Sequence, residues 1–153
     1  MPQHADVLIL GGGVIGLTAA YFLAREGVCV EVVDQADFGR EASWAGAGIL
    51  PPGNPARAKA PYDQLRAHSA ALHPELAAEL REQTSLDNGY VRCGGLDLDE
   101  DLGFAVAAWE QEGIAYERLD ANALRRLEPA LSPDFDGAYH LPEMAQLRNP
   151  RHL

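Results

Sequence analysis

The sequence predicts an α/β fold that begins with a parallel β-α-β unit, and three features near its start indicate this. A short apolar run, residues 7–10 (VLIL), ends abruptly at a GxGxxG motif that begins at Gly11. Apolar residues then recur at helical spacing over residues 14–26. A second apolar run, residues 28–33, is rich in β-branched residues and ends in Asp34. This order indicates two parallel strands, buried on both faces, joined by a right-handed crossover.

Shorter elements are predicted along the rest of the chain. A connector rich in Pro and Gly at residues 51–55 cannot be helical, and a long helix over 62–84 follows it, with Pro74 as a kink or break. Pro150 and the two residues after it resemble the first turn of a further helix. The other predicted elements are strands at 90–92 and 96–98, a helix at 100–112, a strand at 114–117, a helix at 122–127 and a strand at 136–141.

The glycines of the GxGxxG motif suit a phosphate-binding turn. Gly11 permits the turn itself, Gly13 lets the backbone approach a pyrophosphate, and Gly16 lets the helix pack against the first strand. The pyrophosphate would sit on the free N–H groups and the positive dipole end of the helix that starts near Val14. Asp34 would accept hydrogen bonds from ribose hydroxyls and repel a 2′-phosphate. The pattern predicts a Rossmann-like dinucleotide site and leaves NAD and FAD open.

Composition and charge restrict the class of partner. The 153 residues include 12 Lys and Arg against 23 Asp and Glu, a formal charge of −11 that disfavours nucleic acid and anionic lipid. No leader and no stretch of about 20 apolar residues is found, so we expect a cytoplasmic protein without a membrane span. The two cysteines and five histidines lack metal-ligand spacing. Capping by Asp99 accounts for the acidic residues at 97–101 without a cation.

Three segments together resemble a known family: residues 11–17 (GGGVIGL), 32–34 (VVD) and 41–50 (EASWAGAGIL). They are similar to the N-terminal part of the glycine oxidase branch of the D-amino-acid oxidase family, in which the loop after the second strand wraps the flavin side of FAD. Gly46 and Ile49 depart from the family pattern. The motif and the resemblance together imply FAD as the cofactor, bound by Gly11, Gly13, Val14, Ile15, Gly16, Asp34, Gln35, Ala42, Ser43, Ala47, Gly48 and Ile49.

The loop over residues 42–49 is itself suited to cofactor binding. Its small side chains would let backbone amides approach the pyrophosphate and the isoalloxazine ring, and Ser43 would add a hydroxyl donor. A flexible linker of small residues is the alternative interpretation. Trp44 within the loop favours a packed, ordered segment.

The resemblance also implies a function. It is that of an FAD-dependent oxidoreductase that oxidises glycine, or another small amino acid or amine, by hydride transfer to the flavin, with a link to thiamine biosynthesis. The family's substrate-binding residues lie in a later part, so no catalytic residue is assigned here, and Tyr90 and Arg92 are candidates for the outer wall of the site. The alternatives are an NAD-dependent dehydrogenase fragment, a non-catalytic remnant, or one subunit of a split oxidase.

The resemblance implies a division of the chain as well. Residues 1–85 would be the N-terminal part of the FAD-binding domain, and residues 86–141 the beginning of a mixed α+β substrate-binding domain. Residues 142–153 would start a return segment that the chain cuts short. The expected partners are a small amino acid or amine substrate and a partner chain or missing C-terminal half, and a homo-oligomer is left open.

Overall fold

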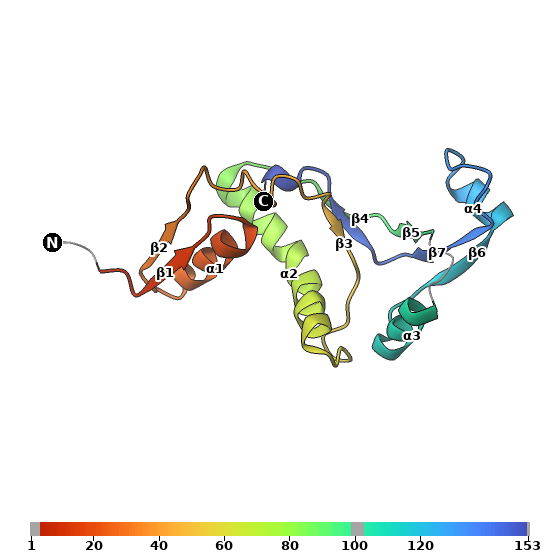
Figure 1. Ribbon diagram of the computed structural model, residues 1–153, viewed down its shortest axis with the longest axis horizontal. Coiled ribbons are helices and arrows are strands. Elements are labelled where there is room, and N and C mark those ends of the chain that lie inside the picture. Colours follow the sequence, from red (N-terminus) through yellow and green to blue (C-terminus); the bar gives the residue numbers. More distant parts are fainter. Residues whose placement is uncertain (1–3, 99–102, 153) are drawn as a thin grey trace. The chain divides into compact units, whose positions relative to one another are not determined.

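The computed structural model describes residues 4–98 and 103–152. The chain folds into two compact units, Met1–Ala47 together with Asn149–Leu153, and Gly48–Arg148. Figure 1 labels most of the elements of both units. Among the described residues, no helix combines the length and the apolar character needed to cross a bilayer.

The first unit contains the predicted β-α-β arrangement. Strand β1 (Val7–Leu10) leads through the glycine turn into helix α1 (Val14–Arg25), and strand β2 (Val30–Val33) follows. The two strands pair in parallel and in register over their whole length. Gly27 ends the helix with a φ of +81°, a conformation that glycine adopts without steric cost. A 3-10 turn, η1 (Pro150–His152), belongs to the same unit and lies where a helical turn was predicted.

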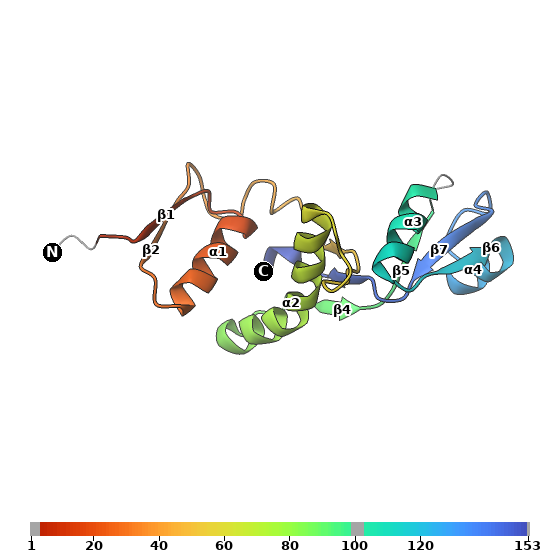
Figure 2. The same cartoon turned by 90° about the horizontal axis from the view of Figure 1, so that it is seen from below.

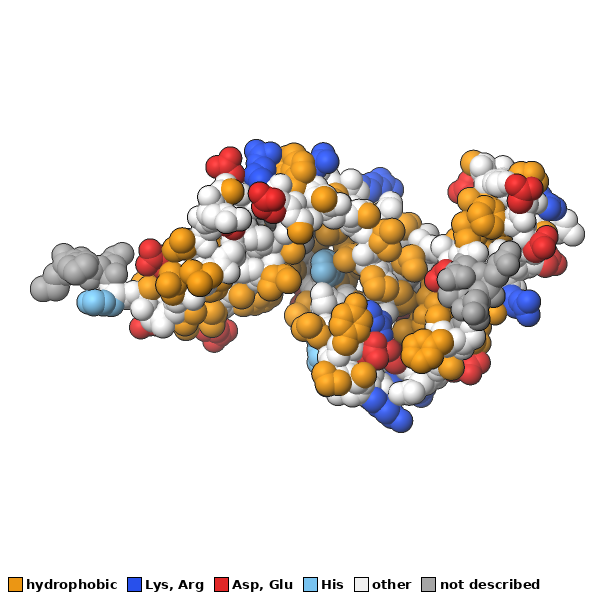
Figure 3. Space-filling view, viewed as in Figure 1, with side chains coloured by type: hydrophobic (Ala, Val, Ile, Leu, Met, Phe, Trp, Pro, Cys, Tyr) orange, Lys and Arg blue, Asp and Glu red, His pale blue; other side chains and the backbone are white. Residues whose placement is uncertain are grey.

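The prediction that these strands are buried on both faces is wrong for the first unit. Side chains alternate between partly buried and exposed along β1, and Leu8 and Leu10 are 58% and 79% exposed. Helix α1 packs against both strands, so side chains on the face away from it stay in contact with solvent. Figure 3 shows hydrophobic side chains, in orange, at the surface of this unit.

In the part of the second unit that the structure describes, there are two antiparallel sheets of three strands each and three helices. Helix α2 (Pro61–Thr84) continues through Pro74 and changes direction within its length, as Figure 2 shows. One sheet has the order β3 (Ile49–Leu50), β8 (Ala145–Leu147), β4 (Tyr90–Arg92). The other has the order β5 (Gly95–Asp97), β7 (Gly137–Leu141), β6 (Glu117–Asp120), and is accompanied by helices α3 (Gly103–Glu112) and α4 (Ala121–Leu127).

The second unit differs from the predictions in two places, and one prediction falls outside the described residues. The strand predicted at 114–117 begins instead at Glu117, because the N–H of Ile114 still donates to the carbonyl of Trp109, 2.9 Å away, and so completes the end of α3. Strands β3 and β8 were not predicted, since two or three residues are too few to show a period. Residues 99–102, with the predicted start of α3 and its Asp99 cap, lie outside the described residues.

The core of the second unit lies between β6, β7 and α4. Leu119, Leu124 and Ala138 are buried there, and partly buried apolar residues from β5 and the neighbouring loops pack around them. Helix α4 is held at its start by Asp120, whose carboxylate accepts the N–H of Ala123 at 2.8 Å. A side chain that caps the helix therefore also ends β6 and joins the two elements.

A buried ion pair connects α2, α3 and the connector after β3. The Arg66 guanidinium pairs with the Glu112 carboxylate, and it also donates to the carbonyl of Pro52. The second carboxylate oxygen of Glu112 accepts the N–H of Asn54 at 3.4 Å. The Arg66 and Glu112 side chains are only 18% and 5% exposed, so the pair itself is largely shielded from water.

Removing one partner of this pair should destabilise the second unit. In Arg66→Met the Glu112 carboxylate stays buried without its opposite charge, and breaking a buried pair in this way costs roughly 3–5 kcal/mol of unfolding free energy. Urea unfolding followed by far-ultraviolet circular dichroism measures the loss.

The matched control is Arg81→Met. Arg81 pairs with Asp87 at 3.5 Å on the surface, where both side chains are more than half exposed, and such a pair contributes about 0–1 kcal/mol. Equal losses in the two variants would show that the Arg66 pair is not the buried clamp described here.

Candidate functional site

The glycine turn after β1 depends on a close approach of its own backbone. Gly11 has a φ of +111°, and its N–H donates to the carbonyl of Val33 at 2.8 Å, which ties the turn to the end of β2. A Cβ atom at Gly16 would overlap the carbonyl oxygen of Gly11 and press against the Ile9 side chain. Any larger residue at position 16 would therefore push the helix away from the strand.

Gly12 is part of this turn although the motif does not require it. Its N–H donates to the Asp34 carboxylate at 2.6 Å, and its carbonyl accepts the N–H of Gly39 at 2.8 Å. The ring of Phe38 covers its α-carbon so closely that a Cβ would overlap the ring. Sequence reasoning did not select Gly12 or Phe38 as site residues. The signal for Gly12 was a glycine between Gly11 and Gly13, at a position that the motif leaves open.

The N-terminus of α1 offers backbone donors. The first intrahelical bond runs from the N–H of Leu17 to the carbonyl of Gly13, so helix geometry leaves the three preceding N–H groups without a partner inside the helix. One of them, on Val14, donates to the Ser43 hydroxyl at 2.9 Å. The helix has no side-chain cap of its own, because Gly13 occupies the cap position. Ile15 is 85% exposed at this end.

Ser43 joins the loop to the glycine turn. Besides accepting the N–H of Val14, its oxygen would lie 3.1 Å from a Cβ built on Gly13, so the two chain segments are in contact there. A hydroxyl that accepts one hydrogen bond keeps its own hydrogen to donate. Ser43 can therefore present a donor beside the backbone donors of the helix, and together they suit an anionic oxygen.

The Asp34 carboxylate accepts backbone hydrogen bonds and keeps further acceptor capacity. Its two oxygens accept the N–H groups of Gly12 at 2.6 Å and Ala36 at 3.0 Å. These bonds, the Gly12 bond first, lower the pKa of Asp34 below its ordinary value of 3.8, with a smaller contribution from the N–H of Gln35. A carboxylate has about four acceptor positions, so these bonds leave some acceptor capacity for the hydroxyls of a sugar.

The loop over residues 42–47 is a series of turns. The N–H groups of Trp44, Ala45 and Gly46 each donate to the carbonyl three residues earlier, at 3.0, 3.2 and 3.3 Å. This regular pattern differs from a flexible linker, the alternative considered from the sequence. Ala42 and Ala47 are exposed at the two ends of the series, and Gln35 is exposed after β2.

The last two predicted site residues lie in the second unit. Gly48 has a φ of +73°, and a Cβ there would overlap the backbone carbonyl of Leu147 on β8. Ile49 pairs with Gln146 across the sheet, and its side chain is 65% exposed. Gly48 is therefore required by strand packing in this unit, whereas Ile49 presents an apolar side chain to its surroundings.

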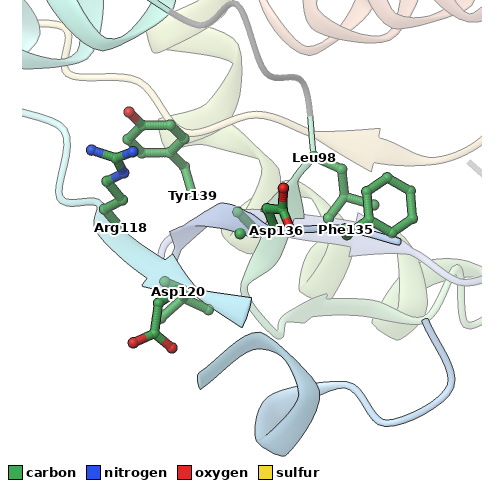
Figure 4. A pocket seen from close by; sticks show the side chains of 9 residues that line it. Leu98, Arg118, Asp120, Phe135, Asp136 and Tyr139 are labelled. Carbon is green, nitrogen blue, oxygen red and sulfur yellow. The ribbon is translucent and has the colours of Figure 1, made fainter. Parts of the chain in front are cut away.

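One cavity of the second unit is not lined by any predicted cofactor residue. It has a volume of about 520 Å³ and lies against β6 and β7. Figure 4 shows Arg118 and Tyr139 on one side and Phe135 and Leu98 on the other, with Asp136 between them. Asp120 also lines it, but its carboxylate already caps α4. Its size alone does not make it the candidate site.

A smaller cavity of about 180 Å³ contains the two residues predicted for the outer wall. Tyr90 and Arg92, on β4, share it with Leu50, the residue after Ile49, and with Glu143. It therefore combines a cation, a carboxylate and a phenol in one place. No group of His, Cys, Asp and Glu among the described residues could hold a metal ion.

Comparison with known proteins supports one family. The family model for FAD-dependent oxidoreductases matches residues 6–153. Glycine oxidase from Pseudomonas putida is 38% identical over 149 residues, which are 95% of this chain and 40% of that protein. The bifunctional protein ThiO/ThiG from a Nostoc species is 35% identical over 148 residues, 94% of this chain and 22% of that protein.

A solved structure agrees in fold. The crystal structure of glycine oxidase from Bacillus cereus matches with a TM-score of 0.82 and 35% identity, over 97% of this chain and 41% of that chain. The chain thus spans about 40% of the length of the glycine oxidases that it matches. The Rossmann-like α/β class predicted from the glycine motif is confirmed. On the match over residues 6–153, the chain belongs to the DAO family of FAD-dependent oxidoreductases.

Proposed function

We propose that this chain contributes the adenosine diphosphate site of a glycine oxidase-like flavoenzyme, which oxidises glycine or another small amino acid or amine. The observation that supports this most directly is the Asp34 carboxylate beside the glycine turn, bonded to the N–H of Gly12 at 2.6 Å. It brings the group that would hold a ribose next to the helix N-terminus that would hold a pyrophosphate.

The residues of the first unit fit such a cofactor. Ile15 and Gly16 would donate backbone N–H groups to the pyrophosphate, and Ser43 would add its hydroxyl. Asp34 would bind the adenosine ribose through the remaining acceptor capacity of its carboxylate. FAD, when bound, supplies the two-electron oxidation of the amine, and the protein binds and orients it.

The predicted site residues in the second unit would serve the flavin end. Gly48 and Ile49 would lie along the ring, with Ile49 as part of an apolar wall. Tyr90 and Arg92 line the same cavity as Leu50, the residue after Ile49. This supports the proposal that Tyr90 and Arg92 form an outer wall of the site. Arg92 would attract the carboxylate of an amino acid there.

The proposal includes the domain assignment and the cellular role. Residues 1–85 would start the FAD-binding domain, residues 86–141 the substrate-binding domain, and residues 142–153 the return segment. A place in thiamine biosynthesis, a cytoplasmic location and a small amine as substrate follow from the resemblance to glycine oxidases. The family match does not favour the alternative of an NAD-dependent dehydrogenase.

The proposed function is tested by titrating the chain with FAD, NADH and NADPH. We expect binding of FAD, seen as a shift of the flavin absorbance and a change of its fluorescence, and weaker or no binding of the nicotinamide cofactors. Peroxide release in the presence of glycine then tests for turnover, with and without candidate partner chains. A chain that binds NADH and not FAD would contradict the proposal.

Neutralising Asp34 should weaken FAD binding. Asp34→Asn keeps the size of the side chain but replaces a charged acceptor by a neutral one, and the difference of about 1.4 kcal/mol between such hydrogen bonds corresponds to roughly tenfold in the dissociation constant. Asp37→Asn, an exposed acid in the same loop, is the matched control and should change little. An equal loss of FAD affinity in both variants would mean that binding depends on the net charge of the loop and not on a contact between Asp34 and the ribose.

The same contact predicts a pH dependence. Because the pKa of Asp34 is lowered in the folded chain, its stabilising contribution is complete above the unfolded value of 3.8 and is lost as the pH falls through the folded pKa. FAD affinity due to Asp34 should therefore be constant from about pH 8 to 5 and fall only below about pH 4. A carboxyl carbon NMR titration of Asp34 in the FAD-free chain measures this pKa, and a value above 3.8 would contradict the expectation.

A further inference from the structure

Two guanidinium groups lie on the indole ring of Trp44. The Cζ atom of Arg40 is 4.3 Å from the ring centroid, and that of Arg151 is 4.5 Å from it. Both distances are well inside the range of about 6 Å over which a cation is attracted to an aromatic face. All three residues belong to the first unit, although Arg151 lies near the far end of the chain.

The contact brings the η1 turn onto the loop. Arg40 is four residues before Trp44 and is a local partner, whereas Arg151 reaches the ring from η1. Of the two, only the Arg151 contact joins distant parts of the chain. Trp44 is 38% exposed, so its ring is partly shielded from water and the attraction is only partly screened.

Backbone hydrogen bonds on both sides of Trp44 shape the loop. Its N–H donates to the carbonyl of Glu41, and the carbonyl of Ser43 accepts the N–H of Gly46. The hydroxyl of the adjacent Ser43 accepts the N–H of Val14 at the start of α1. A displacement of Trp44 would be transmitted through these short turns to Ser43 and would break its contact with the helix.

We propose that Arg151 and Arg40 hold the 42–47 loop against the N-terminus of α1 through Trp44, before any cofactor binds. Arg151 is then a positioning residue: it contacts Trp44, and it acts on the start of α1 through Trp44 and Ser43. The link to cofactor binding rests on the proposed function, while the ordering of the loop does not. Pre-arranging the loop lowers the conformational cost of binding.

The first experiment uses the chain without FAD and measures amide hydrogen exchange of Val14 by NMR. Arg151→Ala should accelerate that exchange by about two- to five-fold, the factor expected for loss of one partly exposed cation–π contact. The amides of Trp44, Ala45 and Gly46 should exchange faster as well. Arg151→Lys keeps the charge without the planar group and should give an intermediate rate.

A matched control removes a comparable contact elsewhere in the same unit. The Arg25 guanidinium lies 5.6 and 5.7 Å from the rings of Tyr21 and Phe22 on α1, away from the loop residues in sequence. Arg25→Ala should leave the exchange of Val14 unchanged. In a Trp44→Leu background, Arg151→Ala should have no further effect, because the aromatic face it acts on is gone.

The second experiment titrates the same variants with FAD. Arg151→Ala and Arg40→Ala should each weaken binding by about two- to five-fold, and Arg25→Ala should not. Unchanged Val14 exchange in Arg151→Ala overturns the proposal. Faster exchange with unchanged FAD affinity overturns its link to cofactor binding. The unmodified chain could fail to bind FAD while Arg151→Ala still accelerates the amide exchange of Val14. That result would support the proposed holding of the 42–47 loop and contradict the proposed function.

Discussion

The hydrogen bond between the N–H of Gly12 and the Asp34 carboxylate is the contact on which the proposed site depends. It joins the turn after β1 to the end of β2, so two segments 22 residues apart are held together by one charge-assisted bond of 2.6 Å. The same bond lowers the pKa of Asp34 and keeps its charge. One interaction therefore fixes the position, and contributes most to lowering the pKa, of the group proposed to bind ribose.

Steric limits around this bond explain why glycine occupies so many positions. Gly16 lies against the carbonyl of Gly11, and Gly12 lies under the ring of Phe38. Side chains at either position would force the helix or the loop outward. The helix N-terminus would then lose its place beside Asp34, and the donors of α1 would no longer converge with Ser43 on one ligand. Backbone packing, more than any side-chain cation, builds this site.

The fold of the first unit could be predicted from local signals, because β1 ends at the glycine motif and α1 follows at once. The same signals did not predict that Leu8 and Leu10 are exposed, since burial depends on elements that a local pattern does not contain. Strands β3 and β8 escaped prediction because they are defined by pairing, as Ile49 opposite Gln146 shows. Gly12, Phe38 and the Arg151 contact with Trp44 also depend on tertiary approach. The motif indicates candidate cofactor residues, but not the tertiary contacts that hold them in place.

The central claim is that the turn after β1 and the end of β2 grip the adenosine diphosphate part of FAD. Mapping of backbone amide chemical shifts during separate titrations with FAD and ADP tests it most directly. We expect both ligands to shift the signals of Gly12, Ile15, Gly16 and Ala36, with FAD adding shifts at Gly48 and Ile49. Shifts confined to the cavity lined by Arg118 and Tyr139, or no shifts with either ligand, would contradict the account.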